Sequence, residues 1–107
     1  MTVEMIGEKE YLEAISSNQE LWVLMRDQQV YLVKSETGNA IATWHRKENA
    51  EEFNEQANLE MLAVSIPIHL FKGTWLKAPQ YGITEIIASP RYGFPGLTFT
   101  KTELLNA

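Results

Sequence analysis

Three consecutive residues, Trp44, His45 and Arg46, carry side chains well suited to hold a ligand or a partner. Trp44 offers a flat apolar face, His45 a ring that titrates near neutral pH, and Arg46 a planar fork of hydrogen-bond donors. A simpler interpretation is that Trp44 closes the core at the end of a strand, while its polar neighbours cover the start of a helix. The residue types alone leave both interpretations open.

A second candidate site is the loop from Arg91 to Gly96, where aromatic residues alternate with glycine and proline. Aromatic and arginine side chains are enriched at contact hot spots, and loops often carry binding residues. The alternative is ordinary turn chemistry, in which the glycines allow positive φ and Phe94 packs into the core. The predicted binding residues of the whole chain are Trp44, His45, Arg46, Arg91, Tyr92 and Phe94.

We predict no metal site and no cofactor. A metal centre would need His45 together with Glu48, Glu52 or His69, and the single pair His45-x-x-Glu48 is too small a ligand set. Transition-metal sites usually draw three or four nitrogen, sulfur or oxygen ligands. The chain has no cysteine, which removes thiolate ligands, disulfides and thiolate nucleophiles.

The sequence motifs of common catalytic sites are missing. There is no Gly-x-Ser-x-Gly elbow, no glycine-rich phosphate loop, no Gly-x-Gly-x-x-Gly turn and no His-Glu-x-x-His helix. Carboxylates are plentiful, but those of the helix predicted near residue 50 look like one solvated face. These are Glu48, Glu51, Glu52 and Glu55. We therefore predict no catalytic residue and favour a function that is not enzymatic.

Charge and the terminal sequence narrow the classes of partner. The 107 residues carry a formal net charge of −5, and the nine basic residues are scattered, so a nucleic-acid partner is not expected. Met1 to Glu8 contains an early acid and neither a basic region nor an apolar run, and no segment approaches the length of a membrane span. We expect a cytoplasmic protein.

The hydrophobic pattern predicts one α+β domain. Residues 8–16 should form a short helix, because Tyr11, Leu12 and Ile15 fall on one face. A three-strand meander should follow, and then a clear helix at 46–58 with Thr43 or His45 near its N-cap. The strands of the meander are expected at 21–25, 29–33 and 40–43.

The remaining predicted elements complete the sheet. They are a strand at 61–66, a helix from Pro67 that ends before Pro79, strands at 83–88 and 97–99, and a helical turn at 102–105. The predicted fold is a mixed, mainly antiparallel sheet of about five or six strands, with an N-terminal meander and about three helices packed against it.

Several landmarks resemble a bacterial family known as domain of unknown function 2750. They are Leu21-Trp22-Val23-Leu24 after a helix, a strand ending in Trp44 before a helix, Phe71-x-x-x-Trp75-Leu76, and a strand leading to Ser89-Pro90. The resemblance implies this fold and a bacterial origin. His45 departs from the family pattern, which favours Pro or Ser after the tryptophan. A looser similarity to secretion-associated domains of the SseB type implies protein binding.

We expect a protein-binding or accessory module, with Trp44, Tyr92 and Phe94 as contact residues and the arginines as anchors. One alternative is a small-molecule-binding or enzymatic domain with a pocket near His45 and Arg91. A second alternative is an immunity or inhibitor protein, since an acidic surface complements a basic partner. A homodimer is a further possibility.

Overall fold

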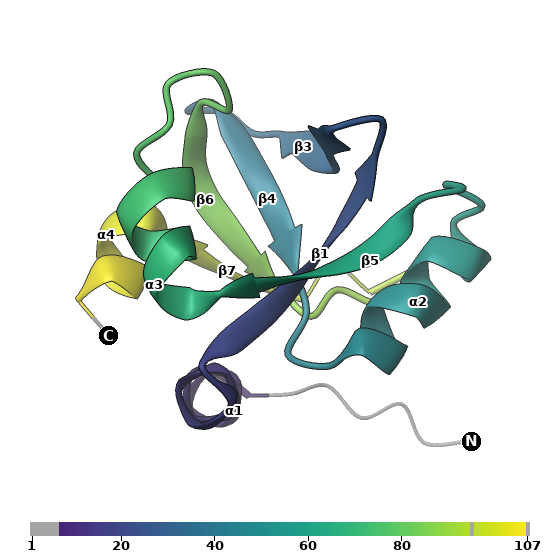
Figure 1. The fold of residues 1–107 in the computed structure, drawn as a ribbon, viewed down its shortest axis with the longest axis horizontal. Coiled ribbons are helices and arrows are strands. Elements are labelled where there is room, and N and C mark those ends of the chain that lie inside the picture. The colour runs from purple at the N-terminus through teal and green to yellow at the C-terminus, as the bar shows by residue number, and fades with distance from the viewer. Residues whose placement is uncertain (1–6, 95, 107) are drawn as a thin grey trace.

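The strands divide between two sheets, and helices cover them from several sides (Figure 1). The computed structural model describes residues 7–94 and 96–106. The helices are α1 (Glu8–Asn18), α2 (Lys47–Gln56), α3 (Ile68–Leu70), which continues as the π-helical turn η1 (Phe71–Trp75), and α4 (Lys101–Leu105). The strands are β1 (Glu20–Arg26), β2 (Gln29–Val30), β3 (Leu32–Lys34), β4 (Asn39–Thr43), β5 (Leu62–Pro67), β6 (Ile83–Ala88) and β7 (Leu97–Thr100).

One sheet has the order β2-β1-β5 and is antiparallel, while the other has the order β3-β4-β6-β7 and contains a parallel pair, β4 and β6. The sheets meet where Trp22 and Trp44 exchange both backbone hydrogen bonds, at 2.8 and 2.9 Å. This contact is an isolated bridge, because β1 and β4 otherwise pair within different sheets. The predicted α+β class is thus confirmed, with the strands split between two sheets.

The predicted meander is present, but its middle strand serves both sheets. Gln29–Val30 pairs with β1 and Leu32–Lys34 pairs with β4. Tyr31 lies between them, and its N–H still donates to the carbonyl of Leu24 at 2.9 Å. The chain therefore crosses from one sheet to the other directly after Tyr31.

Most predicted elements lie within a few residues of their expected bounds, and the differences concern caps and one helix. Arg46, not Thr43 or His45, is the N-cap of α2, because Thr43 is a buried strand residue. The helix expected from Pro67 is a single turn that continues as the π-helical turn η1, which contains Gly73. π-helical turns are rare and are mostly single turns within α-helices. Trp75, the last residue of η1, stacks on Tyr81 with ring centroids 5.2 Å apart.

The larger core cluster lies between the sheets, α1, η1 and α4, and a smaller one packs under α2. Tyr11 of α1 is fully buried, and its hydroxyl bonds to Oγ1 of Thr43, which in turn donates to the carbonyl of Ile87 at 3.0 Å. Burial raises the pKa of Tyr11 well above its ordinary value, so its hydroxyl stays protonated. This chain of bonds fixes α1 to the end of β4.

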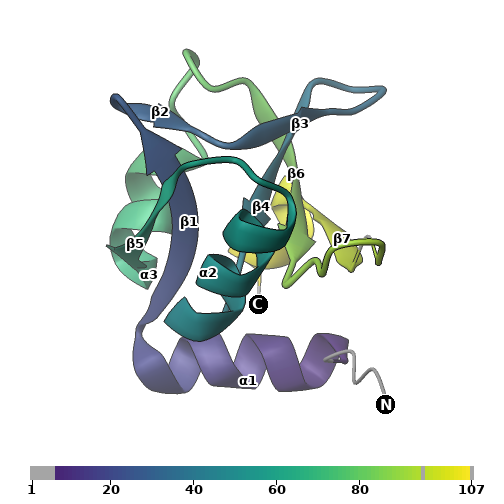
Figure 2. The ribbon, with the colours of Figure 1, turned by 90° about the vertical axis from the view of Figure 1, so that its right-hand side faces the viewer.

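Both views place α2 on one side of the strands and α3 on the other, with α1 across one end (Figures 1 and 2). Within the described residues, no helix is long and apolar enough to cross a membrane.

Candidate functional site

A cavity of about 570 Å³ lies between α1, α2 and the segment that follows β6. Figure 2 shows these three parts next to each other, with α2 above α1 and the chain beyond β6 beside them. The lining residues are Glu10, Ala14, His45, Arg46, Asn49, Glu52, Phe53, Gln56, Ser89, Pro90 and Arg91. Three of the six predicted binding residues, His45, Arg46 and Arg91, therefore meet in one cavity.

The parallel pairing of β4 with β6 brings these residues together. The register places Thr43 opposite Ala88, so both strands end at the same edge and the chain continues as His45 from one and Ser89 from the other. Crevices beyond the carboxyl ends of parallel strands are common ligand sites. The other walls come from two helices, in which residues three or four apart share one face. Glu10 and Ala14 line the cavity from α1, and one face of α2 lines it from Asn49 to Gln56.

His45 and Ser89 form the best-defined contact of the cavity. Nδ1 of His45 lies 2.7 Å from Oγ of Ser89, and the rings of His45 and Tyr11 form a T-shaped pair with centroids 6.4 Å apart. Ser89 is 8% exposed and has φ of 47°, a left-handed conformation that costs free energy in a residue other than glycine. Its N–H donates to the carbonyl of Thr43 at 2.7 Å, which holds this conformation in place.

The pKa of His45 lies below its ordinary value of 6.5, first because burial disfavours the charged ring and second because Arg46 is positively charged. The ring is therefore mostly neutral at pH 7. With Nδ1 engaged by Ser89, Nε2 remains as its other polar atom. A neutral imidazole can either donate or accept a hydrogen bond, depending on its tautomer.

The positive groups of the cavity differ in their partners. Nη2 of Arg91 lies 3.4 Å from Oε1 of Glu52, whereas Arg46 forms no ion pair within residues 7–94 and 96–106. Arg46 is also the N-cap of α2, and its side chain makes no capping hydrogen bond. Unsatisfied N–H groups and the positive end of the helix dipole attract anions. The wall near Arg46 is thus suited to a negatively charged group.

Trp44 lies in the core and does not line the cavity. It is fully buried, packs against Phe53 with ring centroids 5.2 Å apart, and its Nε1 donates to the carbonyl of Pro90 at 2.9 Å. This matches the structural interpretation of Trp44. The side chain supports the cavity indirectly, because its hydrogen bond ties the Pro90 segment to the end of β4.

Tyr92 and Phe94 lie outside the cavity, on a tight turn. Arg91 and Phe94 exchange backbone hydrogen bonds of 2.9 and 2.7 Å, which directs the residues between them outward. Tyr92 is 60% exposed and Phe94 is 42% exposed. Phe94 therefore does not pack into the core, contrary to that part of the turn interpretation, whereas Gly93 and Gly96 do have positive φ. Beyond the turn, Gly96 (φ 77°) is required, because a Cβ there would lie 2.6 Å from the carbonyl of Ala88.

Sequence reasoning missed the remaining lining residues. In the sequence, Ser89 stands out only as part of a family landmark, and Glu10, Asn49 and Gln56 belong to no motif. The end of a strand followed by Ser-Pro was the one available signal. In the part of the chain that the structure describes, no group of three or more His, Cys, Asp or Glu residues is placed to hold a metal ion.

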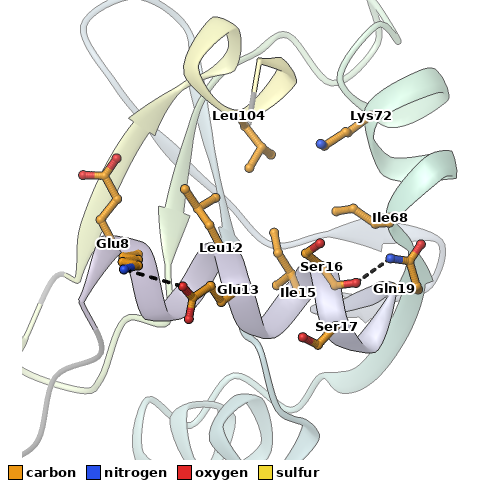
Figure 3. Close-up of a pocket in the computed structure, with 11 residues that line it drawn as sticks. Glu8, Leu12, Glu13, Ile15, Ser16, Ser17, Gln19, Ile68, Lys72 and Leu104 are labelled. Atoms are coloured by element: carbon orange, nitrogen blue, oxygen red, sulfur yellow. Dashed lines mark hydrogen bonds and ion pairs between the residues drawn. The ribbon is translucent and has the colours of Figure 1, made fainter.

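A second cavity, of about 840 Å³, lies between α1, the α3–η1 segment and α4. Figure 3 shows its apolar floor, formed by Leu12, Ile15, Ile68 and Leu104. Charged side chains such as Glu8 and Lys72 stand at its rim. Among the described residues, neither an imidazole nor a guanidinium lines it. Its chemistry is therefore that of a largely apolar hollow.

A family model described as a protein of unknown function, DUF2750, matches residues 9–104. The chain belongs to the DUF2750 family. The matched part of this DUF2750 domain includes every residue of the His45 cavity, from Glu10 to Arg91. No curated protein matches the chain. The family resemblance seen in the sequence landmarks is thus confirmed.

Proposed function

We propose that this DUF2750 domain binds a small anionic molecule, carrying a carboxylate or phosphate group, in the cavity beside His45. The observation that carries the proposal is the convergence of His45, Arg46 and Arg91 at the N-terminus of α2, where the side chain of the N-cap residue makes no capping hydrogen bond. Ligand cavities typically have volumes of a few hundred Å³ and a few convergent polar groups. A binding function also agrees with the missing catalytic motifs.

In this proposal, different walls of the cavity contact different groups of the ligand. The anionic group lies against Arg46 and the first N–H groups of α2, where charge and backbone dipoles both favour it. Neutral His45 supplies a hydrogen bond through Nε2. The carboxylates of Glu10 and Glu52 favour a ligand with hydroxyl or amine donors on its other side.

The test is a titration of the ¹⁵N-labelled protein, followed by NMR, with inorganic phosphate and with succinate in separate arms. We expect saturable shifts of the amides of residues 45–49 and 89–91, and the stronger arm identifies the preferred anion. Arg46→Gln should weaken binding about tenfold, the loss typical of one charged hydrogen bond.

Arg26→Gln is the matched control, since Arg26 contacts Glu60 at 4.0 Å and does not line the cavity. It should bind like the wild type. Absence of saturable shifts with both anions, or equal binding by the Arg46→Gln protein, would contradict the proposal.

Protein binding is the second candidate function, and the exposure of Tyr92 and Phe94 favours it. Two exposed aromatic side chains on a hydrogen-bonded turn are typical anchors of a protein contact. Affinity capture from the source cells should recover a partner with the wild type and lose it with the double variant Tyr92→Ala, Phe94→Ala. Recovery of the same proteins by both would rule out this surface.

A further inference from the structure

Three of the four outer strands of the two sheets are protected against pairing with another chain. β2 has two residues, β3 has three and carries Lys34, and β7 has four and is followed by Lys101. Shortness and lysine are common protections of a sheet edge. β5 lacks both, because it has six residues and no charged side chain.

The hydrogen bonds of β1 show which backbone groups of β5 face outward. Trp22 exchanges bonds with Trp44, and the carbonyl of Leu24 accepts from Tyr31, so both residues of β1 direct their backbone groups away from β5. Successive residues of a strand point these groups to opposite sides. The residues of β1 that face β5 are therefore Leu21, Val23 and Met25.

The register of the pair completes the assignment. The β5 residues opposite those three are Ile66, Val64 and Leu62, and they bond to β1. Their neighbours Ala63, Ser65 and Pro67 consequently direct backbone groups to the outer edge. No strand pairs with this edge within the described part of the chain.

Both ends of this outer edge are closed. The N–H of Met61 donates to Oδ1 of Asn54 at 2.8 Å, and Pro67 has no N–H. The open stretch consists of Ala63 and Ser65, which lie one residue on either side of Val64. Each of these two residues carries one backbone donor and one backbone acceptor. A two-fold rotation about Val64 therefore places the donors of one strand opposite the acceptors of an identical strand.

We propose that β5 pairs antiparallel with β5 of a second copy of this chain, about a two-fold axis through Val64. Ala63 then lies opposite the partner's Ser65, and each such pair exchanges both of its backbone hydrogen bonds. The same register places Leu62, which is 74% exposed, opposite the partner's Ile66, so that apolar surface is covered.

Oligomeric mass provides the first test. Light scattering across a concentration series should show the mass rising from one chain toward two. Leu62→Lys should hold the protein at the mass of one chain, because the exposed side chain tolerates the change and a lysine opposes edge pairing. Val33→Lys, a comparable change on the edge of β3, should behave like the wild type.

Cysteine cross-linking tests the register, since the natural chain has no cysteine. Val64 lies opposite its own copy in a pair without hydrogen bonds, where Cα atoms are about 4.5 Å apart and a disulfide can form. Mild oxidation of the Val64→Cys protein should yield a covalent dimer, and oxidation of Leu62→Cys should not. A single-chain mass at all concentrations, or equal cross-linking of both variants, would overturn the proposal.

Discussion

At the scale of single residues, the contact of His45 with Ser89 defines the candidate site. The two residues are far apart in sequence, and Ser89, in its left-handed conformation, forms hydrogen bonds to the carbonyl of Thr43 and to the ring of His45. His45 was recognisable from its residue type, beside Trp44 and Arg46. Ser89 was not, since a serine next to a proline reads as an ordinary turn.

The lowered pKa of His45 makes the stability of the protein sensitive to acid. The unfolded chain, with the ordinary pKa of 6.5, takes up a proton before the folded protein does. The free energy of unfolding therefore keeps the full contribution of neutral His45 above pH 6.5, and it decreases as the pH falls below 6.5.

Urea unfolding of the wild type and of His45→Gln between about pH 7.5 and pH 5.5 measures the effect. The variant should lose less stability over this range than the wild type does. His69→Gln, at an exposed histidine, should follow the wild type. An unchanged pH dependence in the His45→Gln protein would contradict the stated cause.

At the scale of secondary structure, local patterns were enough to place nearly every element. The alternation of apolar and polar residues, together with turn residues, indicated the strands, and the spacing of Tyr11 and Ile15 indicated α1. These signals act within a few residues of the chain. The π-helical turn η1 was missed, since the stacking of Trp75 on Tyr81 involves residues beyond the helix itself. The low helix propensity of glycine indicates a weak helix around Gly73 but not its geometry.

The β1–β2 hairpin offers a prediction at this scale. Its turn residues Asp27 and Gln28 have φ of 52° and 66°, which fits a turn with two left-handed residues. Gln28→Gly should raise the free energy of unfolding by about 0.5 to 1 kcal/mol, because glycine adopts this conformation without the steric cost. Chemical denaturation measures the change. Gln29→Gly, within β2, should lower stability, and stabilisation by both would show that the turn is not the cause.

At the scale of the whole molecule, the division into two sheets was not predictable from strand positions. It depends on the parallel pairing of β4 with β6 and on the crossing at Tyr31, which join segments distant in sequence. The cavity has the same origin, since its walls come from α1, α2 and the segment after β6. Periodicity carries no information on which distant elements pair.

Tyr11 tests this long-range assembly. Tyr11→Phe removes the hydroxyl that bonds to Thr43 and leaves the ring stacked on Phe99, with centroids 5.9 Å apart. We expect a loss of about 1 to 2 kcal/mol in the free energy of unfolding, the usual cost of an unpaired buried acceptor. Tyr92→Phe, at an exposed tyrosine, should leave stability unchanged. Equal stability of both variants would show that the buried bond contributes nothing.

The parallel pair of β4 and β6 also has a consequence for folding during synthesis. His45 leaves the ribosome well before Ser89, so β4 must wait for residues 83–88 before its second edge is covered. Until then the nascent chain presents an unpaired apolar strand, and contacts of such sequence separation form slowly. The hydrogen bond between His45 and Ser89 therefore forms late in folding, and chains truncated before residue 89 cannot form the cavity.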